Sequence, residues 1–301
     1  MIERYLEYLG VKGTIALLDA NEIPLKPSIR VNTIKTTKTA LQKRLEQKGF
    51  ELVPLDQLPH GFIVSKSPLN LGSLHEYLLG HYYLQNIASM IPPIVLDPKP
   101  DEIVVDMCAA PGSKATQLAQ LMDNKGTLVL IEKNERRINS LEMNLRRMGV
   151  QNAIVYHMDA IELEKANIKA DKILLDAPCT GEGLIRQDAA RKTSKRYQDL
   201  LKLSKIQKRL LNVGLKMLKS GGKMLYSTCS IALEENELVV DEVLKKNPDC
   251  FIKEIPVQYG INGLTLVKNK KLNGNLKHSQ RLYPHLHDTI GFYLCLIEKL
   301  S

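Results

Sequence analysis

The stretch Asp106-Met107-Cys108-Ala109-Ala110-Pro111-Gly112-Ser113-Lys114 decides the fold, because it joins an apolar run at residues 103–105 to the start of a helical pattern. Further apolar runs follow, separated by amphipathic helical patterns, at residues 127–131, 153–156, 172–175 and 223–226. Continuous apolar runs that alternate with helices are typical of a parallel sheet covered on both faces. We therefore predict an α/β fold with a Rossmann-like, doubly wound domain over residues 101–301.

The final apolar run, at residues 292–297, follows its preceding region without a clear helical pattern. A strand that lacks a crossover helix usually pairs antiparallel to its neighbour. We expect this run to form an antiparallel edge strand.

The first hundred residues have a different texture of short, mixed elements. We expect strands at residues 28–32 and 61–64, a helix at 38–45, and a helix from about residue 75 to 91 that Pro92 and Pro93 end. Pro98-Lys99-Pro100 marks a plausible boundary. The sequence thus predicts a small N-terminal α/β domain over residues 1–100.

Positive charge is concentrated in two segments of the chain. The net charge is +9, and from Gly181 to Lys223 there are 12 Lys and Arg residues against 3 Asp and Glu. Residues 268–281 add five basic residues and no acidic one. Clustered positive charge suits a polyanion such as RNA, because binding releases condensed counterions. A charge run can equally be a solvated helix face, so charge alone leaves both interpretations open.

Hydropathy and cysteine spacing limit the class of protein. No stretch is long and apolar enough to span a bilayer, and the start, Met1-Ile2-Glu3-Arg4, lacks the layout of a signal peptide. The five cysteines are odd in number and widely spaced, without the close pairs of zinc sites. We expect free thiols in the cytoplasm, with no metal and no membrane contact.

Acidic residues follow four of the expected strands, at Asp106, Glu132, Asp159 and Asp176. In a doubly wound sheet, ligands bind beyond the carboxyl ends of the strands. The 106–114 stretch has neither the three glycines of a dinucleotide fingerprint nor the upstream glycine of a phosphate-binding loop. Acids without a phosphate cradle favour a nucleoside cofactor, S-adenosylmethionine. Taken alone, Asp159 could equally cap a following helix.

Two of the cysteines also follow expected strands. One lies in Asp176-Ala177-Pro178-Cys179-Thr180-Gly181 and the other in Ser227-Thr228-Cys229-Ser230. A single cysteine is most often a small core residue, and we assign that role to Cys250 and Cys295. Burial alone does not explain two thiols beside the acidic loops. We predict that Cys179 and Cys229 meet at one pocket.

These motifs give the chain its resemblance to a known family. It is similar to the RNA 5-methylcytosine methyltransferases of the Nop2/Sun family over most of its length. The resemblance rests on Arg30-Val31-Asn32-Thr33, Gln85-Asn86-Ile87-Ala88-Ser89-Met90, residues 106–114, residues 176–181, Tyr226-Ser227-Thr228-Cys229-Ser230, Arg281-Leu282-Tyr283-Pro284-His285 and Gly291-Phe292. Two positions depart from the family pattern: Thr180 stands where the family usually has Ser, and Ser113 where it usually has Gly.

The resemblance implies the roles of the site residues. Cys229 would be the nucleophile that adds to carbon 6 of cytosine, Cys179 would assist its release, and Asp176 would hydrogen-bond ring nitrogen N3 and the exocyclic amine. The rival assignment makes Cys179 the nucleophile, as in DNA cytosine methyltransferases. The residues implied to contact S-adenosylmethionine or the base are Cys108, Ala109, Ala110, Pro111, Gly112, Ser113, Lys114, Glu132, Arg137, Asp159 and Asp176.

The resemblance also bears on the substrate. The N-terminal domain resembles the family's N-terminal extension, with an RNA-recognition-like topology, and the compact chain is similar to short forms that modify tRNA. We expect tRNA as substrate and ribosomal RNA as the runner-up. A non-catalytic RNA-binding protein and a small-molecule or protein methyltransferase fit the motifs less well. The residues expected to bind RNA are Lys195, Arg196, Lys205 and Arg209.

Overall fold

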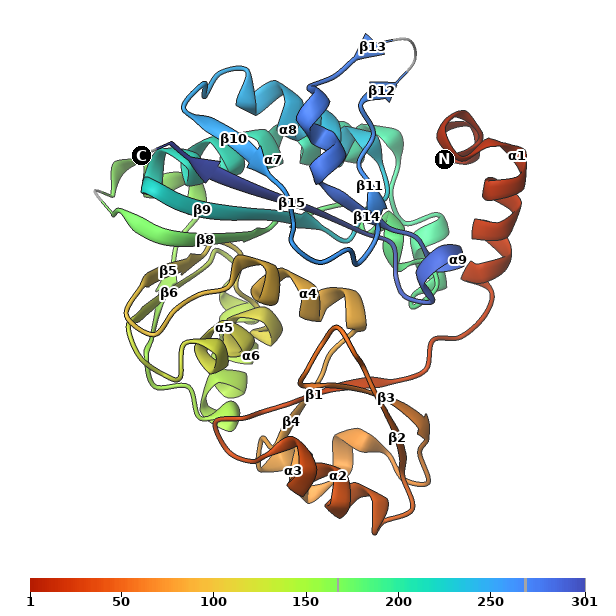
Figure 1. Ribbon diagram of the computed structural model, residues 1–301, viewed down its shortest axis with the longest axis vertical. Helices are drawn as coiled ribbons and strands as arrows, with labels where there is room; N and C mark the ends of the chain where they lie inside the picture. The colour runs from red at the N-terminus through yellow and green to blue at the C-terminus, as the bar shows by residue number, and fades with distance from the viewer. Residues whose placement is uncertain (167, 268–269, 301) are drawn as a thin grey trace.

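The computed structural model describes residues 1–166, 168–267 and 270–300. Lys268, part of the basic segment 268–281, lies outside the described residues. Figure 1 shows a large sheet in the upper part of the molecule and a smaller one below it, with helices packed between and around them. Within the described residues, no helix has the length and apolar character needed to cross a membrane.

The large sheet has a parallel centre. Its strand order is β11-β14-β15-β9-β8-β5-β6-β7, and β10 pairs with β15. The parallel strands, which confirm the five apolar runs expected between residues 103 and 226, are β5 (Ile103–Asp106), β6 (Thr127–Glu132), β7 (Ala153–His157), β8 (Ala170–Asp176) and β9 (Leu218–Thr228).

Both faces of this sheet are buried, as the sequence predicts. Neighbouring strand residues point to opposite faces, so Val104 packs into one core and Val105 into the other. One face is covered by α4 (Ile87–Leu96), α5 (Ser113–Leu121) and α6 (Glu135–Met148). The other face is covered by α7 (Tyr197–Met217) and α8 (Glu237–Leu244). This double cover explains why the strands read as continuous apolar runs.

The last long strand is antiparallel, as predicted, but it is not an edge strand. β15 (Phe292–Lys299) pairs with β9 on one side and with β14 (Gln280–Leu282) and β10 (Cys250–Lys253) on the other. The edge prediction was wrong because short segments between β9 and β15 add strands outside it. The burial of residues 292–297 on both faces fits this interior position.

The prediction of a single helix over residues 75–91 is also wrong. The structure has a short α3 (His75–Leu78), then β4 (Tyr82–Leu84), and then α4. Gly80 ends the first helical turn with a φ of 75°, a conformation that glycine adopts without strain. The polypeptide therefore returns to the small sheet before it enters the large one.

Pro92 and Pro93 lie inside α4 instead of ending it. A proline in a helix leaves the carbonyl four residues earlier without its usual N–H partner. For Pro93 that carbonyl belongs to Ser89, and the side-chain Nε2 of Gln85 donates to it at 2.9 Å. A side chain outside the helix thus replaces a missing backbone donor.

The small sheet is antiparallel, with strand order β2-β3-β1-β4. Along the chain its elements alternate as strand, helix, two strands, helix and strand, which is the topology expected for an RNA-recognition-like domain. Three of its elements confirm the expected runs: β1 (Ser28–Val31), α2 (Lys38–Glu46) and β3 (Gly61–Lys66). Strand β2 (Glu51–Pro54) was not predicted.

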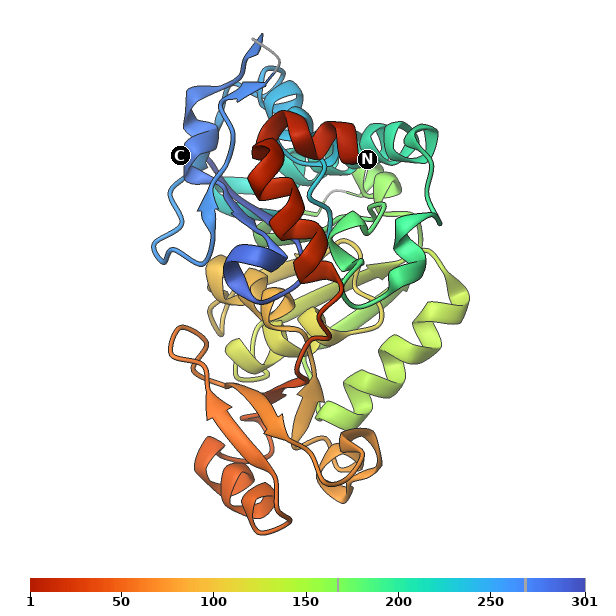
Figure 2. The same ribbon diagram turned by 90° about the vertical axis from the view of Figure 1, so that its right-hand side faces the viewer.

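The first helix, α1 (Ile2–Asn21), lies against the large domain and away from the small sheet (Figure 2). Its Tyr5 and Leu17 are fully buried against Ile231 and Tyr283. Helix α4 likewise packs on α5 of the large domain. The division of the chain at residue 100 stays a prediction.

Shorter elements complete the description. Strands β12 (Leu266–Val267) and β13 (Lys270–Lys271) pair with each other, and β11 (Ile261–Asn262) borders the large sheet. The remaining helical turns are α9 (Pro284–His287), η1 (Leu71–Ser73), η2 (Ala160–Lys165), η3 (Glu182–Leu184), η4 (Ala189–Lys192), η5 (Leu233–Glu235) and η6 (Gly274–His278).

Buried polar contacts join the small sheet to the large domain. The Asn32 side-chain amide donates to the carbonyl oxygens of Gly80 and Met148, each at 2.8 Å. The buried guanidinium of Arg30 donates to Ser113 O and Thr116 Oγ1, both at 2.8 Å. Because Ser113 opens α5, the small sheet helps to hold the start of that helix.

Gly80→Ala tests how closely these parts fit. A Cβ at this position would lie 1.9 Å from Arg147 O, and the φ is positive. We expect a loss of at least about 2 kcal/mol of unfolding free energy, measured by denaturant titration. Gly274→Ala is the control, because its Cβ would meet nothing within 4 Å. Equal midpoints for the two variants would contradict the close approach at Gly80.

Candidate active site

The site lies at the carboxyl edge of the parallel sheet, where β5, β8 and β9 end side by side. Asp176 is the last residue of β8, and in the register of the two strands it is paired with Ser227 of β9. Cys179 lies three residues after Asp176, and Cys229 directly follows β9. Strand pairing therefore brings together two loops that are 50 residues apart in the chain.

The two cysteines meet, as predicted. Their Sγ atoms are 2.8 Å apart, and both thiols are free. The hydrogen bond with Cys229, together with burial, raises the pKa of Cys179 well above its usual value. Cys179 therefore keeps its proton at neutral pH.

The carboxylate of Asp176 is held in a fixed orientation beside the thiols. Lys114 Nζ donates to its Oδ2 at 2.6 Å, and Ser227 Oγ donates to its Oδ1 at 2.8 Å. The ammonium group of Lys114 also lies 5.6 Å from the centre of the Phe292 ring. Each carboxylate oxygen keeps room for a further hydrogen bond, since a carboxylate oxygen can accept more than one.

Two cavities converge on this group. One has a volume of about 370 Å³ and is lined by Glu132, Asp159 and the loop that contains Cys179. The other, of about 390 Å³, opens between Tyr83 and Phe292. The residues that line both cavities are Cys108, Ala110, Arg137, Asp176, Leu184 and Cys229. A molecule in each cavity would therefore meet at Asp176 and Cys229.

The residues predicted to bind the cofactor are divided between these cavities. Cys108, Ala110, Glu132, Arg137, Asp159 and Asp176 line the first. Ala109, Pro111, Ser113 and Lys114 line only the second among the residues described. Gly112 lines neither, but its φ of 105° makes the turn into α5. Their contact with a cofactor stays a prediction.

The acids of the first cavity are positioned by local hydrogen bonds. Glu132 is nearly buried, accepts the Asn134 N–H at 2.8 Å, and lies 3.4 Å from Arg137 Nη1. Arg137 in turn donates to Ala110 O of the 106–114 stretch. Asp159 Oδ1 accepts the Ile161 N–H and so caps η2. For Asp159 the two interpretations of the sequence are compatible, because it caps a helix and also lines the cavity.

A buried glutamate that the sequence analysis missed ties the two cysteine loops together. Glu235 Oε1 accepts the Thr180 N–H at 2.9 Å, and its Oε2 accepts the Thr180 hydroxyl at 2.6 Å. Gln207 Nε2 also donates to Glu235 Oε1, at 3.1 Å. The Thr180 hydroxyl explains why Thr replaces the family's usual Ser, since either side chain supplies it. Nothing near Glu235 in the sequence signals these partners.

The other three thiols are shielded from reaction by burial. Burial raises the pKa of Cys108, Cys250 and Cys295 above the usual range of a thiol, which disfavours the reactive thiolate. Cys250 and Cys295 are buried in the core, as predicted from the sequence. Cys108 packs against that core at the bottom of both cavities.

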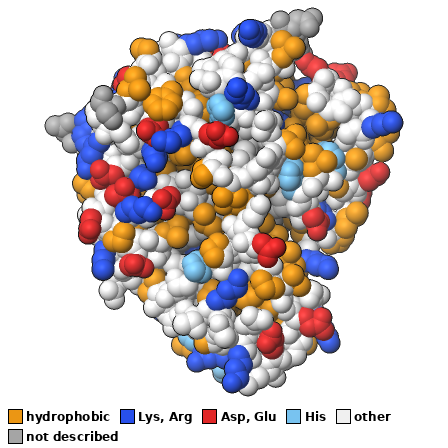
Figure 3. Space-filling model, in the orientation of Figure 1, with side chains coloured by type: hydrophobic (Ala, Val, Ile, Leu, Met, Phe, Trp, Pro, Cys, Tyr) orange, Lys and Arg blue, Asp and Glu red, His pale blue; other side chains and the backbone are white. Residues whose placement is uncertain are grey.

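The basic segments are exposed in part. Lys195, Arg196, Lys205 and Arg209 all lie at the surface. Lys195 and Arg196 border a hollow of about 70 Å³ near the Cys179 loop. On the face shown in Figure 3, Lys and Arg side chains are interspersed with Asp and Glu and do not form one basic patch. Their contact with RNA stays a prediction.

Arg281 is not available to a polyanion. Its side chain is buried, and its guanidinium binds both carboxylate oxygens of Glu237, at 2.6 and 2.9 Å. A buried arginine in a bidentate pair is a structural element. The suggestion that residues 268–281 form a polyanion-binding segment is therefore wrong for this residue.

A Rossmann-like sheet with acids at successive strand ends around a small-molecule cavity defines the class of S-adenosylmethionine-dependent methyltransferases. A family model described as 16S rRNA methyltransferase RsmB/F matches residues 93–298. Another, for the N-terminal domain of 16S rRNA methyltransferase RsmF, matches residues 1–87. The chain belongs to this RsmB/F family, the Nop2/Sun family.

Similar proteins include an enzyme close to this chain in length and a much longer one. The tRNA (cytosine(49)-C(5))-methyltransferase of Pyrococcus abyssi is 38% identical over 92% of this chain and 89% of its own length. The human 28S rRNA (cytosine(4447)-C(5))-methyltransferase is 37% identical over 100% of this chain. The chain spans only 38% of that human relative.

Solved structures agree with this family assignment. A methyltransferase homologue from Pyrococcus horikoshii is 40% identical, with a TM-score of 0.90 over 99% of this chain and 94% of the other. The structure of NSun6 from Pyrococcus horikoshii with SFG is 26% identical, with a TM-score of 0.89 over 100% of this chain and 97% of the other.

Asp106 supplies a pH-dependent test of the geometry of the site. Burial raises its pKa to about 7, and its carboxylate accepts the Cys108 N–H. A carboxyl group whose pKa is higher in the folded state stabilises the protein at low pH. That contribution is lost as the pH rises from about 4, the pKa of an unfolded Asp, to about 7.

Asp106→Asn cannot ionise but can still accept the Cys108 N–H. We expect its unfolding free energy to fall less than that of the wild type between these two pH values, by up to a few kcal/mol. Denaturant titrations across this range measure the difference. Asp56→Asn, at an exposed position, controls for the loss of one carboxylate. Parallel pH profiles for wild type and Asp106→Asn would show that Asp106 is not desolvated.

Proposed function

We propose that this protein transfers a methyl group from S-adenosylmethionine to carbon 5 of a cytosine in RNA, through a covalent bond between Cys229 and carbon 6. The observation that carries the proposal is the pair of sulfur atoms 2.8 Å apart beside the Asp176 carboxylate, where two cavities meet. Methyl transfer that needs no covalent catalysis would leave this pair without a role.

The first cavity fits the cofactor. Its volume lies within the usual range of small-molecule sites, and the nearly buried Glu132 offers a carboxylate to a ribose diol. Asp159 lies across the same cavity, and the apolar side chains of Ile206 and Leu210 form a wall. When bound, S-adenosylmethionine supplies an electrophilic methyl group on a sulfonium. The residues proposed to hold it are Cys108, Ala110, Glu132, Arg137 and Asp159.

The second cavity suits the base. It is bordered by Tyr83 and Phe292 and has Lys114 and Asp176 at its inner end. A carboxylate fixed by Lys114 and Ser227 can accept a hydrogen bond from the exocyclic amine of cytosine. A cytosine must leave its stack to enter, because Asp176 and Cys229 are partly buried in the cavity. Asp176 would then select cytosine and support charge that develops on the ring.

The assignment of the two thiols follows from their environment. Cys179 keeps its proton, since burial and its hydrogen bond to Cys229 raise its pKa. Cys229 lines both cavities, whereas Cys179 lines only the first among the described residues. The nucleophile must reach the base, so Cys229 is the better placed of the two.

The residues act in sequence. The Cys229 thiolate adds to carbon 6, and the electron pair of the C5–C6 bond becomes available at carbon 5, which takes the methyl group. A base then removes the proton from carbon 5, the C5–C6 double bond re-forms, and the C6–S bond breaks with its electrons returning to Cys229. The Cys179 thiol donates a hydrogen bond to the departing Cys229 sulfur and so assists release.

We propose tRNA as the substrate, and the support is the similarity to the archaeal tRNA enzyme, which is 38% identical over 92% of this chain. Ribosomal RNA is the second candidate, supported by the RsmB/F family description. The reaction needs two free thiols, which suits the reducing cytoplasm. Methyl incorporation into purified tRNA and into purified rRNA distinguishes the two substrates. A reaction without RNA is the control.

Cys229→Ala and Cys179→Ala test the thiol roles. We expect Cys229→Ala to form no covalent RNA complex and no 5-methylcytosine. Cys179→Ala should form the complex and release it slowly, so that the complex accumulates on a denaturing gel in the presence of cofactor. Cys250→Ala, at a core position, is the control and should behave as the wild type. Accumulation in Cys229→Ala with loss of the complex in Cys179→Ala would reverse the assignment.

Replacing Lys195, Arg196, Lys205 and Arg209 by Ala tests the proposed RNA interface. Each phosphate that the variant no longer neutralises should reduce the slope of log K against log salt by about 0.9 for duplex-like charge density, so binding should weaken most at low salt. Lys99, Lys125, Lys169 and Lys246, exposed lysines outside both cavities, give a control with the same change in charge. Equal salt slopes for the two quadruple variants would remove the strip from the interface.

A further inference from the structure

We infer that Arg4 of α1 is a positioning residue that holds the Cys179 loop (residues 177–182) and the Cys229 loop (residues 229–235) in register. The inference rests on the proposed function, because it assigns Arg4 to the alignment of the two thiols. It gives the N-terminal helix a part in the active site, although that helix lines neither of the two cavities.

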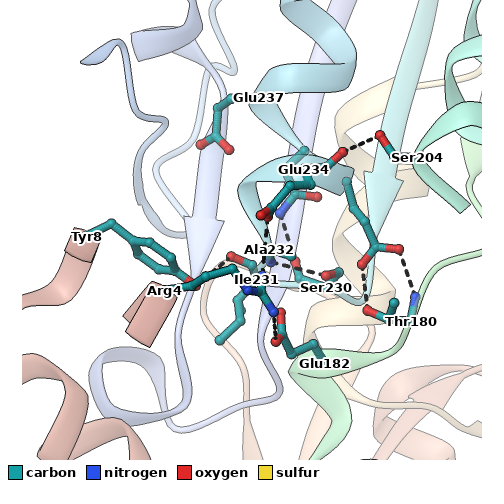
Figure 4. Close-up of polar contacts among 12 residues, drawn as sticks. Arg4, Tyr8, Thr180, Glu182, Ser204, Ser230, Ile231, Ala232, Glu234 and Glu237 are labelled. Atoms are coloured by element: carbon teal, nitrogen blue, oxygen red, sulfur yellow. Dashed lines mark hydrogen bonds and ion pairs between the residues drawn. The ribbon is translucent and has the colours of Figure 1, made fainter. Parts of the chain in front are cut away.

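One guanidinium joins the ends of both loops. Arg4 Nη2 lies 2.5 Å from Glu182 Oε1, and Arg4 Nη1 lies 3.2 Å from Glu234 Oε2. Figure 4 shows Arg4 reaching from α1 between these two carboxylates. Because the nitrogen atoms of a guanidinium are fixed in one plane, a single Arg side chain sets the distance between its two partners.

The contact with Glu182 is buried. The side chain of Glu182 is 2% exposed, and that of Arg4 is 18% exposed. Burial raises the pKa of Glu182, and the charge of Arg4 opposes this shift. Without Arg4, the carboxylate would have to take up a proton or move toward water, and either change would disturb the loop.

The backbone carries this constraint to the nucleophile. Gly183, next to Glu182, donates its N–H to Cys229 O at 2.9 Å. A Cβ on Gly183 would lie 2.8 Å from that same oxygen and 2.1 Å from Gly291 O, so the segments are in close contact. A shift of Glu182 would therefore move the backbone at Cys229.

A second side chain of α1 reaches the Cys229 loop. Tyr8 OH donates to Ile231 O at 3.3 Å, and Arg281 Nη1 donates to the same oxygen at 3.2 Å (Figure 4 shows Tyr8 and Ile231). Glu235 already ties Thr180 to the Cys229 loop from within the domain. Arg4 and Tyr8 add contacts at Glu182, Glu234 and Ile231.

Helix α1 also offers a matched control. Just beyond its end, Glu22 pairs with Lys192, which follows the Cys179 loop by ten residues. This pair joins the same two parts of the chain, but its side chains are 68% and 44% exposed. Exposed ion pairs contribute little, so Lys192→Ala should leave the thiols in place.

The experiment measures thiol alignment and catalysis separately in Arg4→Ala, Arg4→Lys and Lys192→Ala. Alignment is measured without RNA, by the rate at which dibromobimane becomes fluorescent as it bridges two thiols, with Cys179→Ala as background. Catalysis is measured in single turnover, as formation and release of the covalent RNA complex, together with KM for RNA.

In Arg4→Ala we expect both the rate of thiol bridging and the rate of RNA release to fall at least about tenfold, since small displacements of reacting groups cost large factors in rate. KM for RNA should change less than about twofold. Arg4→Lys, which keeps the charge but not the two-armed geometry, should be intermediate. Lys192→Ala should match the wild type.

If Arg4→Ala bridges its thiols and releases RNA at the wild-type rates, the inference is overturned. It is also overturned if every catalytic step slows equally while the bridging rate stays unchanged. If wild-type protein forms no covalent RNA complex, the proposed function fails, and the bridging rates still decide the positioning role. Should Arg4→Ala not fold, Glu234→Gln removes one partner of the guanidinium at a site that is 18% exposed. It should slow bridging in the same direction, and a wild-type rate there would count against the inference.

Discussion

The hydrogen-bonded pairing of β8 with β9 is the constraint on which the active site depends. It places Asp176 beside Ser227, and each strand then needs only a few residues to bring its cysteine to the same point. A parallel sheet fixes this arrangement with backbone bonds alone, whatever the side chains that follow. The loops have little to do beyond turning the two thiols toward each other.

Around this pairing, buried charged side chains are matched with partners of opposite charge or with hydrogen-bond donors. Lys114 neutralises Asp176, Glu235 accepts the backbone and hydroxyl of Thr180, and Arg281 binds Glu237 on both oxygens. Each buried charge without a partner would cost several kcal/mol, so these partners constrain one another. The result is a fixed frame around two thiols, which is what the proposed covalent reaction requires.

The sequence reveals the elements whose signals are local. The parallel strands could be predicted because apolar runs alternate with helices, and the meeting of Cys179 and Cys229 because both follow such runs. The single helix predicted over residues 75–91 failed because Gly80 ends α3 and β4 follows it. The prolines fail to end α4 because Gln85 supplies a side-chain donor. Arg4 and Glu235 were missed because Glu182 and Thr180, their respective partners, lie more than 50 residues away and are brought close by packing.

The interior position of β15 has a consequence for how the molecule is made. On the ribosome, β9 emerges well before β15, the strand that later covers it, so for a time the parallel centre has an open, hydrogen-bonding edge. Helix α1 emerges before the large sheet, yet Tyr283, against which it packs, is translated only after β9. Helix α1 must therefore wait undocked until the segment that contains Tyr283 has been made.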